Sequence, residues 1–230
     1  MRTEVYYFSG TGNSLAVARA IAEKINGTLI SIPTVMDGPS IKTDADGIGI
    51  VFPCYLAQLY GIPLIVASFV KKLEDLGSKY IFAVCTCGGF ENVNALPTLK
   101  NLEKIIQARG GKLVAEFTVR LPMNNLDYSA IPFPIDQDQE TMFRNSQVKI
   151  ESICQRVAHR KKSPYRTLKG LFNGFMTPLY RVLQNFYITD LKKKAQEPKD
   201  TTLAFDALIP LTDKSIYADD QCNGCATCAR

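Results

Sequence analysis

The sequence is poor in the residues that most enzymes use for acid–base and nucleophilic catalysis. Its 230 residues include one histidine, His159, which stands beside the basic run Arg160-Lys161-Lys162. That position is typical of a solvated basic face, which argues against a metal centre or a proton relay built on histidine. No Ser-His-Asp, Cys-His or paired-carboxylate arrangement is recognisable. The scarcity disfavours enzymes whose own side chains supply the acid, base or nucleophile.

Long apolar runs are also missing. The longest, Ile62 to Val70, contains Pro63 and Ser68, and it falls far short of the roughly 20 residues that a membrane-spanning helix needs. The N-terminus passes from Arg2 directly into a predicted strand, without the apolar segment and cleavage site of a signal peptide. We therefore expect no transmembrane segment and a cytoplasmic location. The cysteines number seven, an odd count, and three cluster at the C-terminus, which favours metal or redox chemistry over a disulfide framework.

The net charge of +5 is unevenly distributed along the chain. Residues 1–154 carry 14 Lys/Arg and 15 Asp/Glu, whereas residues 155–230 carry 13 and 7, so the two parts have net charges of −1 and +6. The C-terminal part is therefore the basic one. Charge alone does not choose among nucleic acid, an anionic membrane surface and an acidic protein as its partner.

A glycine-rich turn, Phe8-Ser9-Gly10-Thr11-Gly12-Asn13-Ser14, lies near the start of the chain. The run Val5 to Phe8 before it is typical of a buried parallel strand. After it, apolar residues recur at helical spacing: Leu15, Ala18, Ile21, Ala22 and Ile25. Backbone N–H groups in the first turn of a helix have no intrahelical partner and attract anions. The turn is therefore predicted to bind a phosphate, with further donors from Ser9, Thr11, Asn13 and Ser14 and close backbone approach at Gly10 and Gly12.

Two other phosphate-binding motifs are excluded by what this turn lacks. A Walker loop needs a lysine before its Ser/Thr, and no lysine lies between Gly10 and Ser14. A dinucleotide-binding fingerprint needs a third glycine where this sequence has Leu15. The alternative that remains is a tight strand-to-helix turn capped by Asn13 or Ser14, without any ligand.

Strands and helices are predicted to alternate through the first 120 residues. After the first strand, further strands are predicted at 28–32, 47–52, 80–85 and 113–119, and helices at 62–73 and 96–106. This alternation implies right-handed βαβ units and an α/β fold with a five-stranded, doubly wound parallel sheet covered on both faces. In such sheets, ligands bind at the carboxyl edge where the strand order reverses.

The strand, the Ser-Gly-Thr-Gly-Asn-Ser turn and the helix together resemble the FMN-phosphate loop of the flavodoxin family. The resemblance covers about residues 1–160 and implies a flavodoxin-like sheet of strand order 2-1-3-4-5 with FMN as cofactor. Three further loops would then join the phosphate loop around the flavin. Their candidate residues are Pro53, Cys54, Tyr55 and Leu56, then Thr86, Cys87, Gly88, Gly89, Phe90 and Asn92, and finally Asn124 and Asn125.

Each of these loop residues has a functional and a purely structural interpretation. Tyr55 either forms a wall for the flavin ring or covers the sheet edge. Gly88 and Gly89 would let backbone amides reach the polar edge of the ring, and the asparagines either bind it or cap turns. Cys54, Cys85 and Cys87 are expected to be small buried fillers. Cys154 is expected in the core, on the stripe of a predicted helix that includes Phe143, Ile150, Ile153 and Val157.

An appendage follows, which we predict to be a basic helical spacer and linker over residues 161–218. Apolar residues from Leu168 to Phe186 follow helical spacing, and Lys192 to Thr202 is a polar stretch typical of a linker. An apolar stripe of this length must be buried. We expect it to pack on the flavodoxin-like core, with contact to a membrane surface as the alternative.

The last twelve residues, 219–230, contain Cys222, Cys225 and Cys228 at C-x-x-C-x-x-C spacing. This spacing matches the opening of a bacterial ferredoxin run that binds a 4Fe–4S cluster, with the three cysteines as metal ligands. Half of a zinc site is a weaker alternative, because no second Cys/His pair lies at suitable spacing. The ferredoxin run would place its next cysteine two residues beyond Arg230. We therefore expect residues 219–230 to be the start of a truncated ferredoxin domain, unable to hold an ordinary cluster.

Together the two motifs resemble flavodoxin–ferredoxin fusion proteins. The resemblance implies an FMN-binding electron-transfer flavoprotein whose partner is a ferredoxin-type iron–sulfur domain or another redox protein, and not nucleic acid. The 4Fe–4S cluster would belong to the full-length parent. One alternative is an FMN-dependent NAD(P)H or quinone reductase, and a second is a cofactor-free interaction or anchoring protein on the same fold.

Overall fold

A computed structural model describes residues 2–55, 60–89, 91, 94–123, 136–162, 185 and 187–212. The chain divides into two compact units, Met1–Phe175 and Met176–Arg230. Leu56, Phe90, Asn92, Asn124, Asn125 and the cysteines at 222, 225 and 228 lie outside the described residues, as does the predicted stripe from 168 to 186 except at residue 185.

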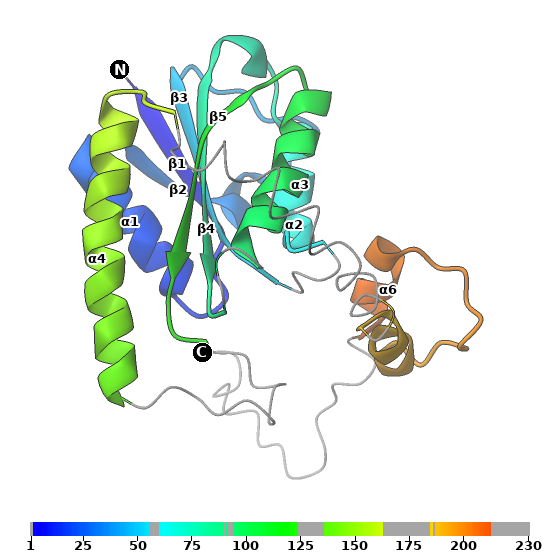
Figure 1. Cartoon of the computed structure of the whole chain (residues 1–230). Coiled ribbons are helices and arrows are strands. Elements are labelled where there is room, and N and C mark those ends of the chain that lie inside the picture. Colours follow the sequence, from blue (N-terminus) through cyan, green and yellow to red (C-terminus); the bar gives the residue numbers. More distant parts are fainter. Residues whose placement is uncertain are drawn as a thin grey trace, which may run out of the picture. The chain divides into compact units, whose positions relative to one another are not determined.

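A five-stranded parallel sheet forms the centre of the first unit (Figure 1). Its strands are β1 (Thr3–Tyr7), β2 (Thr28–Ser31), β3 (Gly47–Pro53), β4 (Tyr80–Cys87) and β5 (Leu113–Arg120). They run parallel in the order β2-β1-β3-β4-β5, which confirms the predicted flavodoxin-like, doubly wound fold. The chain order reverses at β1 and β3, so a ligand crevice is expected at the carboxyl ends of these two strands.

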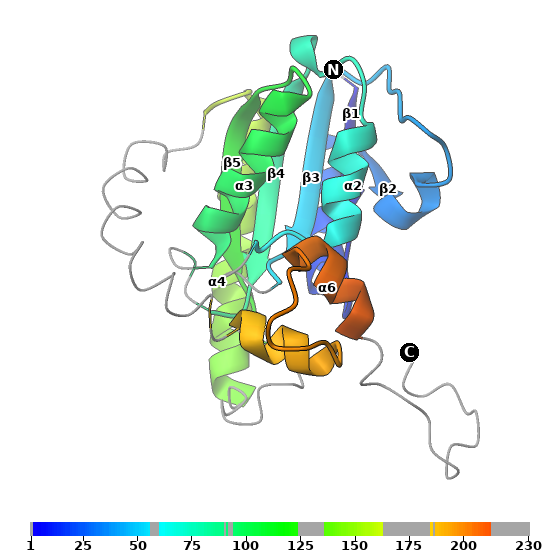
Figure 2. The same ribbon diagram turned by 90° about the vertical axis from the view of Figure 1, so that its right-hand side faces the viewer.

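Helices cover both faces of the sheet (Figures 1 and 2). The helices α1 (Asn13–Ile25) and α4 (Asp136–Ala158) lie on one face, and α2 (Leu64–Lys72) and α3 (Ala95–Ala108) lie on the other. Each pair encloses its own apolar core, one around Phe82 and the other around Phe52 and Phe69. No helix in the described part of the chain is long and apolar enough to cross a membrane.

Most element ends differ by one or two residues from the sequence prediction, and two of these differences have a clear physical cause. The strand β4 was expected to end at Cys85 but continues to Cys87, because Thr86 still pairs with both β3 and β5. The helix α2 begins at Leu64, two residues later than expected. Pro63 occupies the position before it with an extended backbone (φ −56°, ψ 137°), so the helix starts only after this proline.

The helix α4 buries most of the stripe predicted for it. Ile150, Ile153, Cys154 and Val157 are buried against the α1 side of the sheet, as expected. Phe143 does not follow them, because its side chain is 45% exposed. The stripe therefore covers only the C-terminal half of this 23-residue helix.

The described residues of the second unit include two helices. Residues 187–194 form one helix, and α6 (Phe205–Leu211) forms another. These helices confirm a helical C-terminal part. The polar stretch from Lys192 was predicted to be a linker, but residues 192–194 continue the first helix, which ends with Gln196 in the left-handed conformation (φ 56°).

Candidate cofactor site

The glycine-rich turn connects β1 to α1 and is held by hydrogen bonds of its own. The Gly12 N–H donates to Ser9 Oγ over 3.0 Å, and the Ala16 N–H donates to the Gly12 carbonyl over 2.9 Å. Gly12 has a φ of 98°, a left-handed conformation that residues with a side chain rarely adopt. The turn therefore closes tightly and starts the helix at Asn13.

The N-terminus of α1 has no side-chain cap in the described part of the chain, and its first turn contains no acidic residue. Neither Asn13 nor Ser14 therefore caps this helix, contrary to the capping considered for the turn. Both residues lie inside the helix, where their side chains bond elsewhere. The backbone N–H groups of this first turn have no acceptor within the helix and carry the positive end of the helix dipole.

Asn13 and Ser14 connect the turn to two other loops. The Asn13 Nδ2 donates to the Pro122 carbonyl over 3.1 Å, just after β5. The Ser14 hydroxyl lies 2.8 Å from the Thr86 hydroxyl at the end of β4, and both side chains are buried. These contacts join residues 109 and 72 positions apart in the sequence. They fix the start of α1 against the carboxyl edge of the sheet.

Tyr55, which follows β3, closes the site beside the contacts to Pro122 and Thr86. Its ring meets Phe8 edge-on, with centroids 6.3 Å apart and an interplanar angle of 84°, and 43% of the residue is exposed. Partial burial raises the pKa of the Tyr55 hydroxyl, and a hydrogen bond with the Gly10 backbone opposes that rise. A Cβ on Gly10 would lie 2.6 Å from this hydroxyl oxygen, so Gly10 lets the tyrosine approach the turn.

The loops after β4 and β5 also touch each other. A Cβ on Gly88 would lie 2.7 Å from the Cα of Met123, and the Leu121 N–H donates to the Cys87 carbonyl over 3.0 Å. Lys149 of α4 forms an ion pair with Glu91 in the loop after β4, and its ammonium group lies 3.3 Å from the Thr118 hydroxyl. The four loops are therefore one connected structure.

The structure brings together most of the predicted site residues that it describes. Ser9 to Ser14, Cys54, Tyr55 and Thr86 to Gly89 all lie at the carboxyl edge of the sheet, and Pro53 ends β3 beside them. Sequence reasoning missed Gly61, whose carbonyl accepts the Tyr55 N–H over 2.9 Å, and Lys149. A glycine just before a helix start was a usable signal for Gly61 (φ 83°). Nothing in the sequence indicated Lys149.

The described residues offer no group of side chains suited to a metal ion. Within residues 2–55, 60–89, 91, 94–123, 136–162, 185 and 187–212, no group of three or more His, Cys, Asp or Glu is arranged to hold a metal ion. The predicted ligands Cys222, Cys225 and Cys228 lie outside these ranges.

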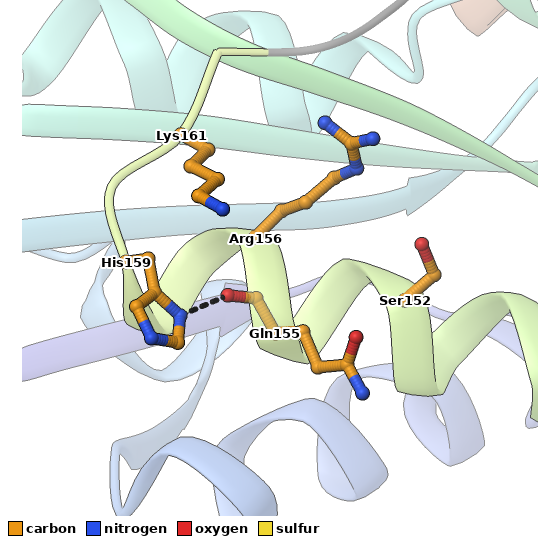
Figure 3. Close-up of a pocket in the computed structure, with 5 residues that line it drawn as sticks. All are labelled: Ser152, Gln155, Arg156, His159 and Lys161. Atoms are coloured by element: carbon orange, nitrogen blue, oxygen red, sulfur yellow. Dashed lines mark hydrogen bonds between the residues drawn. The ribbon is translucent and has the colours of Figure 1, made fainter.

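A basic pocket lies at the end of α4 (Figure 3). It is lined by Ser152, Gln155, Arg156, His159 and Lys161. The exposed His159 donates from Nδ1 to the Gln155 carbonyl over 2.7 Å, in the basic surface expected for it. The Tyr80 hydroxyl lies 3.4 Å from the Lys161 carbonyl, which places the pocket at the amino end of β4. The length of β4, roughly 25 Å, separates this pocket from the glycine-rich turn at the carboxyl edge of the sheet.

No protein family and no curated protein matches this sequence. Several solved structures are similar. They include a putative flavoprotein from Bacteroides uniformis, 19% identical over 52% of this chain and 90% of that one, with a TM-score of 0.40. Oxidised Flavodoxin 1 from Bacillus cereus is 20% identical over 66% and 98%, with a TM-score of 0.42. The Trp repressor binding protein from Bacillus subtilis is 12% identical over 68% and 96%, with a TM-score of 0.43. At these identities and scores the similarities carry no conclusion about ligand or activity.

Proposed function

We propose that the first unit binds FMN and works as an electron-transfer flavoprotein. The observation that carries the proposal is the uncapped N-terminus of α1, which loops from β3, β4 and β5 surround and fix in place. A helix N-terminus of this kind stabilises a phosphate without any basic side chain. Its position at the point where the strand order reverses is where doubly wound sheets bind their ligands.

The residues present fit FMN. The backbone N–H groups at the start of α1, with the hydroxyls of Ser9 and Thr11, would hold the phosphate. Tyr55 offers an aromatic face at the same edge, and the backbone of Gly88 and Gly89 offers polar groups. When bound, FMN supplies reversible electron transfer, which requires no acid, base or nucleophile from the protein.

We further propose that the electrons pass to or from a ferredoxin-type iron–sulfur domain or protein. The support is the spacing of Cys222, Cys225 and Cys228, which suits the ligands of a 4Fe–4S cluster.

Replacement of Thr11 by alanine tests the phosphate site. If its hydroxyl donates to the phosphate dianion, Thr11→Ala weakens FMN binding by about 1.5–3 kcal/mol, the usual range for a hydrogen bond to a charged group. Riboflavin, which lacks the phosphate, binds the variant as it binds the wild type. Thr34→Ala is the control, because the Thr34 hydroxyl bonds to the Ser31 carbonyl in the 3₁₀ turn after β2. Equal losses for FMN and riboflavin, measured by fluorescence titration, would contradict the assigned role.

A further inference from the structure

Three thiols share one face of the sheet beside the candidate cofactor site. Cys54 follows the last residue of β3, and Cys85 and Cys87 lie at the end of β4. All three belong to the core on the α2 and α3 side, where Cys85 and Cys87 are buried and Cys54 is partly exposed. Cys54 is therefore the most exposed of the three cysteines.

The surroundings of Cys54 act on its thiol in both directions. The thiol donates to the Asn94 carbonyl over 3.4 Å, which favours the protonated form, and its sulfur lies 3.2 Å from the Thr98 hydroxyl. A hydrogen bond from the Cys85 thiol lowers the pKa of Cys54; burial opposes this, and the Thr98 hydroxyl adds to it. Burial raises the pKa of Cys85 well above its ordinary value and that of Cys87 to about 12. Because the thiolate is the reactive form, Cys54 is the nucleophile of the group.

The strand register selects the partner of Cys54. Phe52 pairs with Cys85 and Pro53 with Thr86. The Cys54 N–H donates to the Thr86 carbonyl over 2.7 Å, which continues the ladder and places Cys54 opposite Cys87. Opposite residues on neighbouring strands lie about 4.8 Å apart, whereas the diagonal from Cys54 to Cys85 is roughly 8 Å. Disulfide-bonded residues have Cα atoms about 4.4–6.8 Å apart, so the register places the backbone of Cys87, rather than that of Cys85, within bridging distance of Cys54.

We propose that Cys54 and Cys87 form a thiol–disulfide couple that responds to hydroperoxides. The Cys54 thiolate attacks one oxygen of hydrogen peroxide, the O–O bond breaks, and the second oxygen leaves as hydroxide, which becomes water by taking up the proton that the Cys54 thiol released on ionising. Cys54 is then a sulfenic acid and the peroxide is reduced. The Cys87 sulfur next attacks the Cys54 sulfur, the S–O bond breaks, and the Cys87 proton leaves with the hydroxyl as water. The Cys85 thiol stabilises the attacking thiolate. This couple does not depend on FMN.

Peptide mapping of the reduced full chain after treatment with hydrogen peroxide tests the couple. The wild type gives a cross-linked product that has lost two hydrogen atoms and joins the Cys54 peptide to the peptide with Cys85 and Cys87. Cys85→Ser still forms it, several-fold more slowly. Cys87→Ser does not form it and instead accumulates a Cys54 sulfenic acid that dimedone traps. Cys154→Ser is the control, because Cys154 is buried on the opposite face of the sheet, and it behaves as the wild type.

A second measurement needs no variant. Iodoacetamide alkylates Cys54 of the folded wild type at least about tenfold faster than Cys154, because burial raises the pKa of Cys154. Three results would overturn the proposal: equal alkylation rates for these two thiols, a cross-link that persists in Cys87→Ser, or a cross-link from Cys54 to a cysteine of residues 222–228.

Discussion

Gly88 lies where the loop after β4 passes closest to the loop after β5. A Cβ at this position would lie 2.6 Å from the Cβ and 2.7 Å from the Cα of Met123, so a backbone must move to admit it. We expect Gly88→Ala to lower the free energy of unfolding by about 1–3 kcal/mol, the usual cost of overpacking.

Gly77→Ala is the matched control for this substitution. Its added methyl would meet only the Gly110 carbonyl, at an ordinary distance of 3.7 Å. The control changes the unfolding free energy by less than about 0.5 kcal/mol. Urea denaturation of both variants makes the comparison, and a Gly88→Ala midpoint equal to that of Gly77→Ala would contradict the packing described for these loops.

Glu4 is a buried carboxylate in β1 whose charge is balanced by its neighbours. It accepts hydrogen bonds from the hydroxyls of Tyr6 and Thr43 and pairs with Arg2 over 3.0 Å. Burial alone would raise the pKa of Glu4, but the two hydroxyls and the Arg2 guanidinium together lower it below its ordinary value of 4.5. The charged form of this side chain is therefore the one that the fold stabilises.

Because of this balance, the contribution of Glu4 to the free energy of unfolding depends on pH. Because the folded-state pKa is depressed, the stabilisation is complete above pH 4.5 and is lost as the pH falls through the folded pKa. Glu4→Gln keeps the shape but removes the charge. We expect it to be less stable than the wild type at about pH 7, with the difference shrinking towards about pH 3. A difference in urea midpoint that stays constant over this range would show that the charge plays no part.

For single residues, the sequence indicates the type of side chain but not the partners that it contacts. The polar side chains of Asn13 and Ser14 suggested phosphate contacts or a cap, and the structure shows bonds to Pro122 and Thr86. Such partners lie on other strands, so only the assembled sheet determines them. The three cysteines near the site were correctly expected to be mostly buried, since Cys85 and Cys87 are. Their alignment across β3 and β4 depends on a strand register that the sequence does not show.

At the scale of elements, α4 holds the loop after β4 through Lys149. This lysine and its partner Glu91 have side-chain exposures of 26% and 27%, and the ammonium group also contacts Thr118. We expect Lys149→Met, which keeps the apolar stem, to lower the free energy of unfolding by about 1 kcal/mol. Hydrogen exchange in residues 86–91 should also become faster, because the loop loses its anchor.

Lys24→Met is the matched control on the neighbouring helix. Lys24 of α1 pairs with Glu151 of α4, but the two side chains are 47% and 60% exposed. Water and salt screen such a pair, so the control leaves both the stability and the exchange of the loop unchanged. Equal effects in the two variants would mean that Lys149 is only another surface charge.

The elements themselves were largely predictable, and their ends were not. Each predicted strand is present because buried parallel strands consist of β-branched and aromatic residues that few other structures favour. The end of β4 depends on how far its two neighbours extend, which is a property of the sheet. The exposure of Phe143 similarly depends on where α4 leaves the sheet, a tertiary feature without a local signal.

At the scale of the whole molecule, the alternation of strands and helices was enough to predict a doubly wound sheet. The order of its strands came from the resemblance of one loop to flavodoxins, and the structure confirms that order. The convergence of the loops followed from the fold, since parallel strands present all their carboxyl ends at one edge. The part of the site formed by residues 56, 90, 92, 124 and 125 remains a prediction from sequence.

Binding of FMN through its phosphate at the carboxyl edge of the sheet is tested most directly by a calorimetric titration of the full chain with FMN and with riboflavin. Both ligands share the ring system, but only FMN carries the group that the N-terminus of α1 would hold. We expect one FMN per chain, bound at least about tenfold more tightly than riboflavin, a difference of about 1.4 kcal/mol. Equal affinities for the two ligands, or no binding of FMN at all, would contradict it.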